Sequence, residues 1–197
     1  MHATTAGLKV LVSTTAIADL ETARRSMGGH GFSEFAGVGR LYADYVPAAT
    51  YEGDNFVLDG QVVRAALKAF ARFTSEKSGD LGPNEAYLRR LGGAEGPTNA
   101  KAGEWGNPQT AIELLERRAA CMVRERAKHA SDPDASSDRR VARAVTDAFV
   151  AAQVGEIIRG LEQSVGGKEA AILRKLYTLV STVRFNFKRN CCLIALE

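Results

Sequence analysis

Cysteine, proline and aromatic residues are scarce in this chain of 197 residues, which contains 3 cysteines, 5 prolines and 7% aromatic residues. Cys191 and Cys192 are chain neighbours, which rarely bridge each other, and Cys121 stands alone without a CxxC spacing. We therefore expect neither a disulfide framework nor a cysteine-bound zinc ion. His30 has no second histidine at a ligand-like spacing, so no metal site of any kind is predicted.

An excess of charge of one sign is also missing, since 26 Lys and Arg residues face 23 Asp and Glu residues. No basic stripe with interleaved aromatic residues is present, which argues against nucleic-acid binding. No apolar run approaches the ~18 residues of a membrane span. The first residues lack the basic segment of a signal peptide. A reduced, intracellular compartment fits this composition best.

Alternating strand patterns are absent, and the sequence predicts an all-α protein. Apolar residues at three-and-four spacings indicate amphipathic helices. A glycine-rich stretch, 78–107, has the composition of a linker or excursion, with one short helical piece and Trp105 as an anchor. The predicted parts are 1–77, a linker 78–107, and a second helical region 108–197. Helices are expected at 4–27, about 40–45, about 54–76, 108–129, 137–165 and 168–187.

The segment "TYEGDN" places one carboxylate, Glu52, between an aromatic residue and a glycine, where a loop turns into a helix. Asp54 is a plausible N-cap for that helix. A glutamate in this setting can be partly desolvated on one side, which strengthens it as a base, and closely approached by a ligand on the other. The alternative is that Glu52 caps the helix or pairs with an arginine.

The segment "GGHGF" begins with Gly28 and Gly29, directly after the first predicted helix. Backbone amides freed by glycines can bind phosphate oxygens. A helix C-cap followed by a tight turn explains the same glycines equally well. His30 alone is expected to be structural.

Together these segments, in the stretch that runs from Gly7 to Phe70, closely resemble the acyl-CoA oxidase family of flavoenzymes, in its fungal-type members above all. "GGHGF" and "TYEGDN" stand at the family's spacing, and weaker similarity continues over 108–187. The resemblance implies an incomplete helical bundle of the C-terminal type found in acyl-CoA dehydrogenases and oxidases. Residues 1–77 would be the last part of the central helical domain, and 108–197 a truncated C-terminal domain.

The resemblance also implies residue roles. Glu52 matches the catalytic base that takes the α-proton of a fatty acyl-CoA thioester while the β-hydride passes to FAD. Gly28 and Gly29 match the glycine pair that approaches the FAD of the partner subunit in a homodimer, and Asp54 and Asn55 would lie beside the flavin. The implied reaction is the first step of peroxisomal fatty acid β-oxidation, with O2 reduced to H2O2.

Two alternatives stay open at this point. The "EGDN" form favours an oxidase, because the related acyl-CoA dehydrogenases usually carry threonine at the position of Asp54. The first alternative is an acyl-CoA dehydrogenase relative, which would pass electrons to a protein acceptor instead of to O2. A non-catalytic helical fragment is the other alternative, and the 197 residues alone are expected to be inactive because the family's β-rich domain has no counterpart in them.

Overall fold

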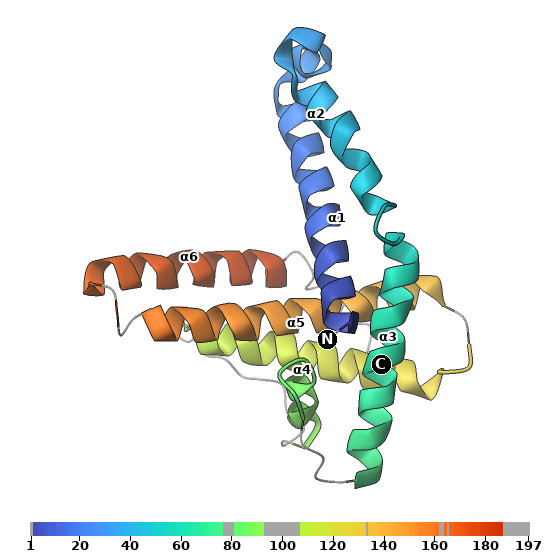
Figure 1. The fold of residues 1–197 in the computed structure, drawn as a ribbon. Coiled ribbons are helices and arrows are strands. Elements are labelled where there is room, and N and C mark those ends of the chain that lie inside the picture. The colour runs from blue at the N-terminus through green and yellow to red at the C-terminus, as the bar shows by residue number, and fades with distance from the viewer. Residues whose placement is uncertain are drawn as a thin grey trace. The chain divides into compact units, whose positions relative to one another are not determined.

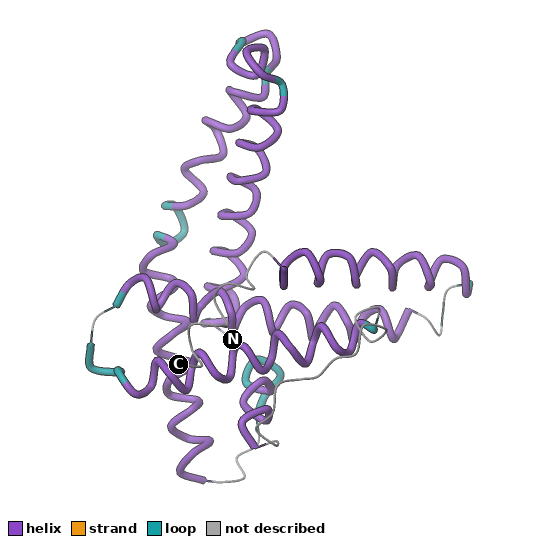
Figure 2. Tube along the Cα trace, turned by 180° about the vertical axis from the view of Figure 1, so that it is seen from behind, coloured by secondary structure: helices purple, strands orange, loops and turns teal. Residues whose placement is uncertain are grey.

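The computed structural model describes residues 2–76, 81–92, 107–132, 134–161, 164 and 166–186. Every regular element within these ranges is a helix (Figures 1 and 2), so the predicted all-α class is confirmed. The chain divides into two compact units, Met1–Ala65 and Ala66–Glu197, called unit 1 and unit 2 below.

Unit 1 is built on its first helix. Helices α2, η1 and η3 all pack against α1, and Gly28 ends that helix with a left-handed φ of 59°. The core of the unit is formed by small and branched apolar side chains from α1, η3 and α3, among them Leu11, Ala48 and Leu58. The elements are α1 (His2–Ser26), η1 (Gly28–Phe32), η2 (Glu34–Ala36), α2 (Val38–Tyr45), η3 (Val46–Ala49) and the first part of α3 (Asn55–Glu76).

Unit 2 is a bundle in which α4 packs against α5, α6 and η4. Its core is rich in alanine, which lets the helices approach closely: a Cβ on Gly155 of α5 would lie 2.6 Å from Cδ1 of Ile112. The Tyr177 hydroxyl donates to the carbonyl of Ala151 at 2.8 Å. The elements are η4 (Ala86–Gly92), α4 (Pro108–Lys128), α5 (Ala135–Leu161) and α6 (Gly167–Asn186).

A buried charge cluster lies inside unit 2. The side chains of Arg118 and Asp147 are 5% and 1% exposed, and Nη1 of Arg118 lies 3.9 Å from a carboxylate oxygen of Asp147. Arg143 donates from Nε to the other oxygen at 3.1 Å. Nε and Nη1 of Arg118 have no hydrogen-bond partner among the described residues. The carboxylate of Asp147 supplies a nearby opposite charge, which lowers the cost of burying this arginine.

The helix boundaries expected from the sequence agree with the structure to within a few residues. Asn107 caps α4 through a 3.0 Å bond to the amide of Gln109, with Pro108 as the first helical residue. The short piece predicted within the linker winds as a 3-10 helix, η4, rather than as an α-helix. The expectations for Trp105, Cys191 and Cys192 concern residues outside the described ranges.

Candidate active site

The "TYEGDN" turn is fixed by hydrogen bonds on both of its sides. Before it, the amides of Thr50 and Tyr51 donate to the carbonyl of Pro47 in η3, at 2.9 and 3.1 Å. After it, the amide of Phe56 donates to Oδ1 of Asp54 at 2.8 Å. Asp54 is thus the N-cap of α3, as predicted. Its carboxylate satisfies an amide at the positive end of the helix, where negative charge is favoured.

Glu52 lies between these two anchors in an uncommon backbone conformation. Its φ of 57° makes it the one non-glycine residue with positive φ among the described residues. The side chain is exposed, and it makes no hydrogen bond or ion pair with another described residue. Both structural alternatives for Glu52, a helix cap and an arginine pair, therefore lack support in this part of the chain. Residues in the left-handed region whose side chains make no stabilising local contact are concentrated at functional sites.

Asn55 connects the start of α3 to α1. Its Oδ1 accepts a bond from Nζ of Lys9 at 2.9 Å, and its Nδ2 donates to the hydroxyls of Ser13 at 3.0 Å and Thr14 at 3.3 Å. Lys9 also donates to the carbonyl of Gly53 at 2.7 Å. The side chain of Asn55, expected beside the flavin, is thus engaged within unit 1.

The glycines of "GGHGF" differ in what surrounds them. A Cβ on Gly28 or Gly29 would meet no atom within 4 Å, and both residues are exposed. A Cβ on Gly31 would lie 1.9 Å from the carbonyl oxygen of Arg24. Gly31 is therefore required for η1 to fold back on the last turn of α1, whereas the backbone at Gly28 and Gly29 is open to an approaching molecule.

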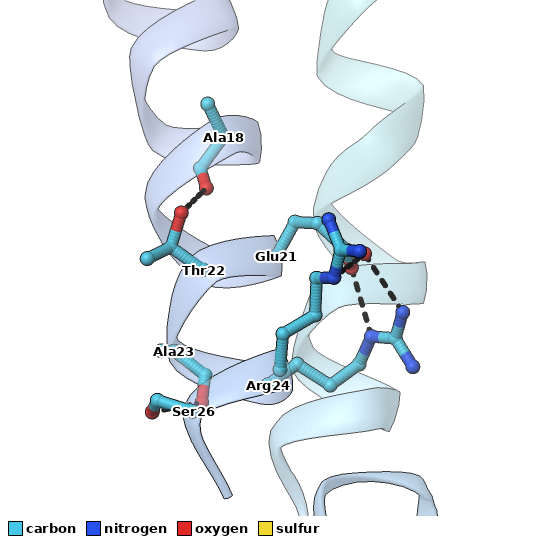
Figure 3. A network of polar contacts seen from close by, with 7 residues as sticks. Ala18, Glu21, Thr22, Ala23, Arg24 and Ser26 are labelled. Carbon is cyan, nitrogen blue, oxygen red and sulfur yellow. Dashed lines mark hydrogen bonds and ion pairs between the residues drawn. The ribbon is translucent and has the colours of Figure 1, made fainter. Parts of the chain in front are cut away.

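Arg24 holds η1 on the end of α1. Its guanidinium donates two hydrogen bonds to the carboxylate of Glu21, at 2.8 and 2.9 Å. Both are drawn as dashed lines in Figure 3. The hydrogen bond from Arg24 lowers the pKa of Glu21 and raises that of Arg24 itself. The same guanidinium lies 4.1 Å from the centre of the Phe32 ring, a cation–π distance.

Unit 1 therefore brings both predicted motifs onto one helix. The "TYEGDN" turn is tied to α1 at Ser13, and "GGHGF" is tied to it at Arg24. At the 1.5 Å rise of an α-helix, these points are about 16 Å apart along α1. Sequence reasoning missed Lys9, which no local pattern singles out, and Gly31, whose place as the third glycine of its motif was an available signal.

Comparison with known proteins identifies the family of the chain. Residues 1–67 match the family model described as "Acyl-CoA oxidase, C-alpha1 domain". An alignment of 178 positions, which covers 85% of the chain, is 36% identical to peroxisomal acyl-coenzyme A oxidase 1 of Arabidopsis thaliana and spans 26% of that protein. The chain belongs to the acyl-CoA oxidase family.

Solved structures of acyl-CoA oxidases agree with this assignment to the family. The Arabidopsis thaliana acyl-CoA oxidase 1 structure matches with a TM-score of 0.74 and 33% identity, over 90% of this chain and 28% of that one. Acyl-CoA oxidase-1 of Caenorhabditis elegans, complexed with FAD and ATP, matches with a TM-score of 0.66 and 26% identity, over 100% of this chain and 30% of that one. The chain thus spans between a quarter and a third of the length of these oxidases.

The described residues form neither a metal-binding cluster nor a membrane-spanning helix. They contain no cluster of three or more His, Cys, Asp or Glu side chains able to hold a metal ion. None of the described helices combines the length and the apolar character needed to cross a membrane.

Proposed function

We propose that this chain contributes the catalytic base and one edge of the cofactor site to a peroxisomal, FAD-dependent acyl-CoA oxidase. The reaction is α,β-dehydrogenation of a fatty acyl-CoA to the trans-2-enoyl-CoA, with O2 reduced to H2O2. The observation that carries the proposal is the position of Glu52: an exposed, unpaired carboxylate in a left-handed conformation, inside the stretch that matches the family model.

Glu52 is the base in this proposal. An α-proton of a thioester is too weakly acidic for a freely moving carboxylate to remove in water, so the base must be oriented beforehand. The anchored turn supplies that orientation, because Tyr51 and Asp54 on either side of Glu52 are fixed by hydrogen bonds. In the reaction, the Glu52 carboxylate takes the α-proton as the C–H bond breaks and the α,β double bond forms.

The residues present fit FAD at the glycine pair. The open backbone at Gly28 and Gly29, where even an added Cβ would touch nothing within 4 Å, allows the close approach that the family resemblance implies. When bound, FAD accepts the β-hydride and passes the electrons to O2. In this proposal Asp54 and Asn55 act on the flavin side of the turn by fixing its backbone, because their side chains are already engaged in hydrogen bonds.

The names of the curated relatives support the peroxisome as the compartment. A homodimer is proposed as well, since the open glycine pair would then face the FAD of the second copy.

A chimeric enzyme tests the proposal, with the matching segment of the Arabidopsis thaliana oxidase replaced by this chain. The chimera should bind FAD and form H2O2 with a fatty acyl-CoA. Glu52→Gln should retain FAD yet lower the rate of flavin reduction by about 10³-fold, within the range for loss of a general base. Glu34→Gln, an exposed glutamate of the same unit, is the matched control.

Near-normal flavin reduction in Glu52→Gln would refute the assignment of the base. Reduction by substrate without H2O2 formation, but with turnover on an added electron-transfer protein, would favour the dehydrogenase alternative.

A further inference from the structure

We propose that Lys9 is a positioning residue for Glu52, a role that rests on the function proposed above. Lys9 lies on α1, 43 residues before Glu52 in the chain. Its ammonium donates to the carbonyl of Gly53 at 2.7 Å and to Oδ1 of Asn55 at 2.9 Å. Lys9 thus bonds to the residue that follows the base and to the first residue of α3.

The hydrogen-bond inventory of the cluster gives Lys9 a specific task. The single proton of the Ser13 hydroxyl has its shortest acceptor in the carbonyl of Lys9, at 2.8 Å, and Oδ1 of Asn55 is 3.3 Å away. Oδ1 of Asn55 therefore depends on the ammonium of Lys9 for its strong bond. Nδ2 of Asn55 then points to Ser13 and Thr14, so Lys9 also sets the orientation of the Asn55 amide.

The backbone at Glu52 explains why such a clamp is needed. A non-glycine residue in the left-handed region is disfavoured by roughly 1–2 kcal/mol, so the conformation persists only where the surroundings fix it. Gly53 follows with φ of 104°, and without a side chain of its own it cannot hold the turn. The bond from Lys9 to the Gly53 carbonyl fixes the peptide unit between Gly53 and Asp54, one residue beyond the base.

Two features of the cluster suit a positioning role. A bond with a charged donor is shorter and stronger than one between neutral groups, which agrees with the 2.7 Å distance to Gly53. Lys9 is half-buried, and its partners on the turn belong to the same unit. Loss of the ammonium should therefore let Glu52 move while α1 and α3 stay folded.

The first test uses the chimeric oxidase. Lys9→Met keeps the length of the side chain but removes the donor. The expected result is a fall in kcat of about 10²-fold, the size expected for a base displaced by about 1 Å. KM and FAD occupancy should stay near normal, and Lys9→Arg, which can still bridge two acceptors, should recover part of the rate. Lys68→Met, on the exposed face of α3, is the matched control.

The second test needs no activity and uses the 197-residue chain. Amide hydrogen exchange of peptides covering residues 50–56 should become at least several-fold faster in Lys9→Met, while peptides of α1 and of unit 2 keep their rates. Asn55→Ala should accelerate the same peptides. The double variant should add little to either change, because both side chains act in one network.

The outcomes separate the two proposals. An inactive wild-type chimera, or an active Glu52→Gln, would defeat the proposed function, and the exchange measurement would still decide whether Lys9 holds the turn. An active chimera whose kcat is unchanged by Lys9→Met would overturn the positioning role. A fall in kcat that is fully accounted for by loss of FAD would also overturn the positioning role, since Lys9 would then contribute only to folding.

Discussion

Units 1 and 2 are both helical, but they place their polar side chains in different ways. In unit 1 the side-chain amide of Asn55 is half-buried, and both its oxygen and its nitrogen form hydrogen bonds. The nearby carboxylate of Glu52 is exposed. In unit 2 the charges of Arg118 and Asp147 lie inside the bundle, and two nitrogens of Arg118 have no hydrogen-bond partner among the described residues.

On the function proposed above, this difference distinguishes a site in unit 1 from a structural feature in unit 2. A fully satisfied polar network rigidifies its surroundings, so the network around Asn55 can hold a strained residue ready at the surface. A buried ion pair with unsatisfied nitrogens is a weak source of stability, although breaking it leaves an uncompensated charge. On the function proposed above, the site lies at the unpaired exposed carboxylate of Glu52 rather than at the buried charges of unit 2.

The largest effect should come from breaking the charge cluster of unit 2. Asp147→Ala leaves Arg118 buried without its partner, so the free energy of unfolding should fall by about 3–5 kcal/mol. Urea unfolding of the 197-residue chain measures the change, and hydrogen exchange assigns it to unit 2. The double variant Arg118→Met, Asp147→Leu should recover most of the loss. A double variant as unstable as the single one would mean that the pair itself stabilises unit 2.

The glycines of unit 1 should separate folding from cofactor binding. Gly31→Ala forces the backbone of η1 away from Arg24, which should lower the free energy of unfolding by about 1–3 kcal/mol, as overpacking does. Gly29→Ala has open space around it and should change stability by less than about 0.5 kcal/mol. In the chimeric oxidase, Gly29→Val should lower FAD occupancy. Equal instability of the two alanine variants would contradict this division.

The helices of both units could be predicted from the sequence because their signals are local. Three-and-four apolar spacing, the cap at Asp54 and the Asn107-Pro108 start each act within a few residues. The clamp of Lys9 could not be predicted, since it joins positions far apart in the chain through one side chain. The left-handed φ of Glu52 was also hidden, because glutamate carries no preference for that region. The roles proposed for Gly28, Gly29 and Glu52 rest on family motifs rather than on physical pattern alone.

The two helix caps offer a matched pair, one in each unit. Asp54→Ala and Asn107→Ala each remove a side-chain acceptor for a first-turn amide, so each should lower the free energy of unfolding by about 1 kcal/mol. In the chimera only Asp54→Ala should also slow flavin reduction, because Asp54 anchors the turn that carries Glu52. A similar loss of rate in Asn107→Ala would show that the rate follows stability rather than the geometry of the turn.

Replacing Glu52, the proposed base, by glycine should stabilise the turn. Glu52→Gly removes the penalty of a left-handed side chain, partly offset by the greater freedom of glycine in the unfolded chain. The free energy of unfolding should rise by about 0.5–1 kcal/mol while activity is lost. Glu52→Ala keeps a Cβ and should bring no such gain. If both variants were equally stable, the turn would not hold Glu52 under strain.

The smallest effect should come from the Glu21–Arg24 pair near the end of α1, and its pH dependence distinguishes it from the buried cluster. The bond from Arg24 lowers the pKa of Glu21 in the folded chain, so its contribution is present above the unfolded pKa and is lost as pH falls through the folded one. Because an ion pair between residues three apart on one helix contributes little to stability, Glu21→Gln should leave the unfolding midpoint nearly unchanged at neutral pH. Glu125→Gln, which removes the bond to Lys128 on α4, is its counterpart in unit 2. An NMR titration of the Glu21 carboxyl should give a pKa below the ordinary glutamate value, and 0.5 M salt should move it back toward that value.

The partner of Glu21 makes a further contact that distinguishes this pair from the pair of Glu125 and Lys128. Arg24, which is bonded to Glu21, also stacks on the ring of Phe32 in η1. Glu21→Gln should therefore accelerate hydrogen exchange in peptides covering residues 28–36 even where the midpoint does not move, while Glu125→Gln should leave exchange in its own helix unchanged. Equal exchange in both variants would show that the Glu21 carboxylate plays no part in holding "GGHGF" on the end of α1.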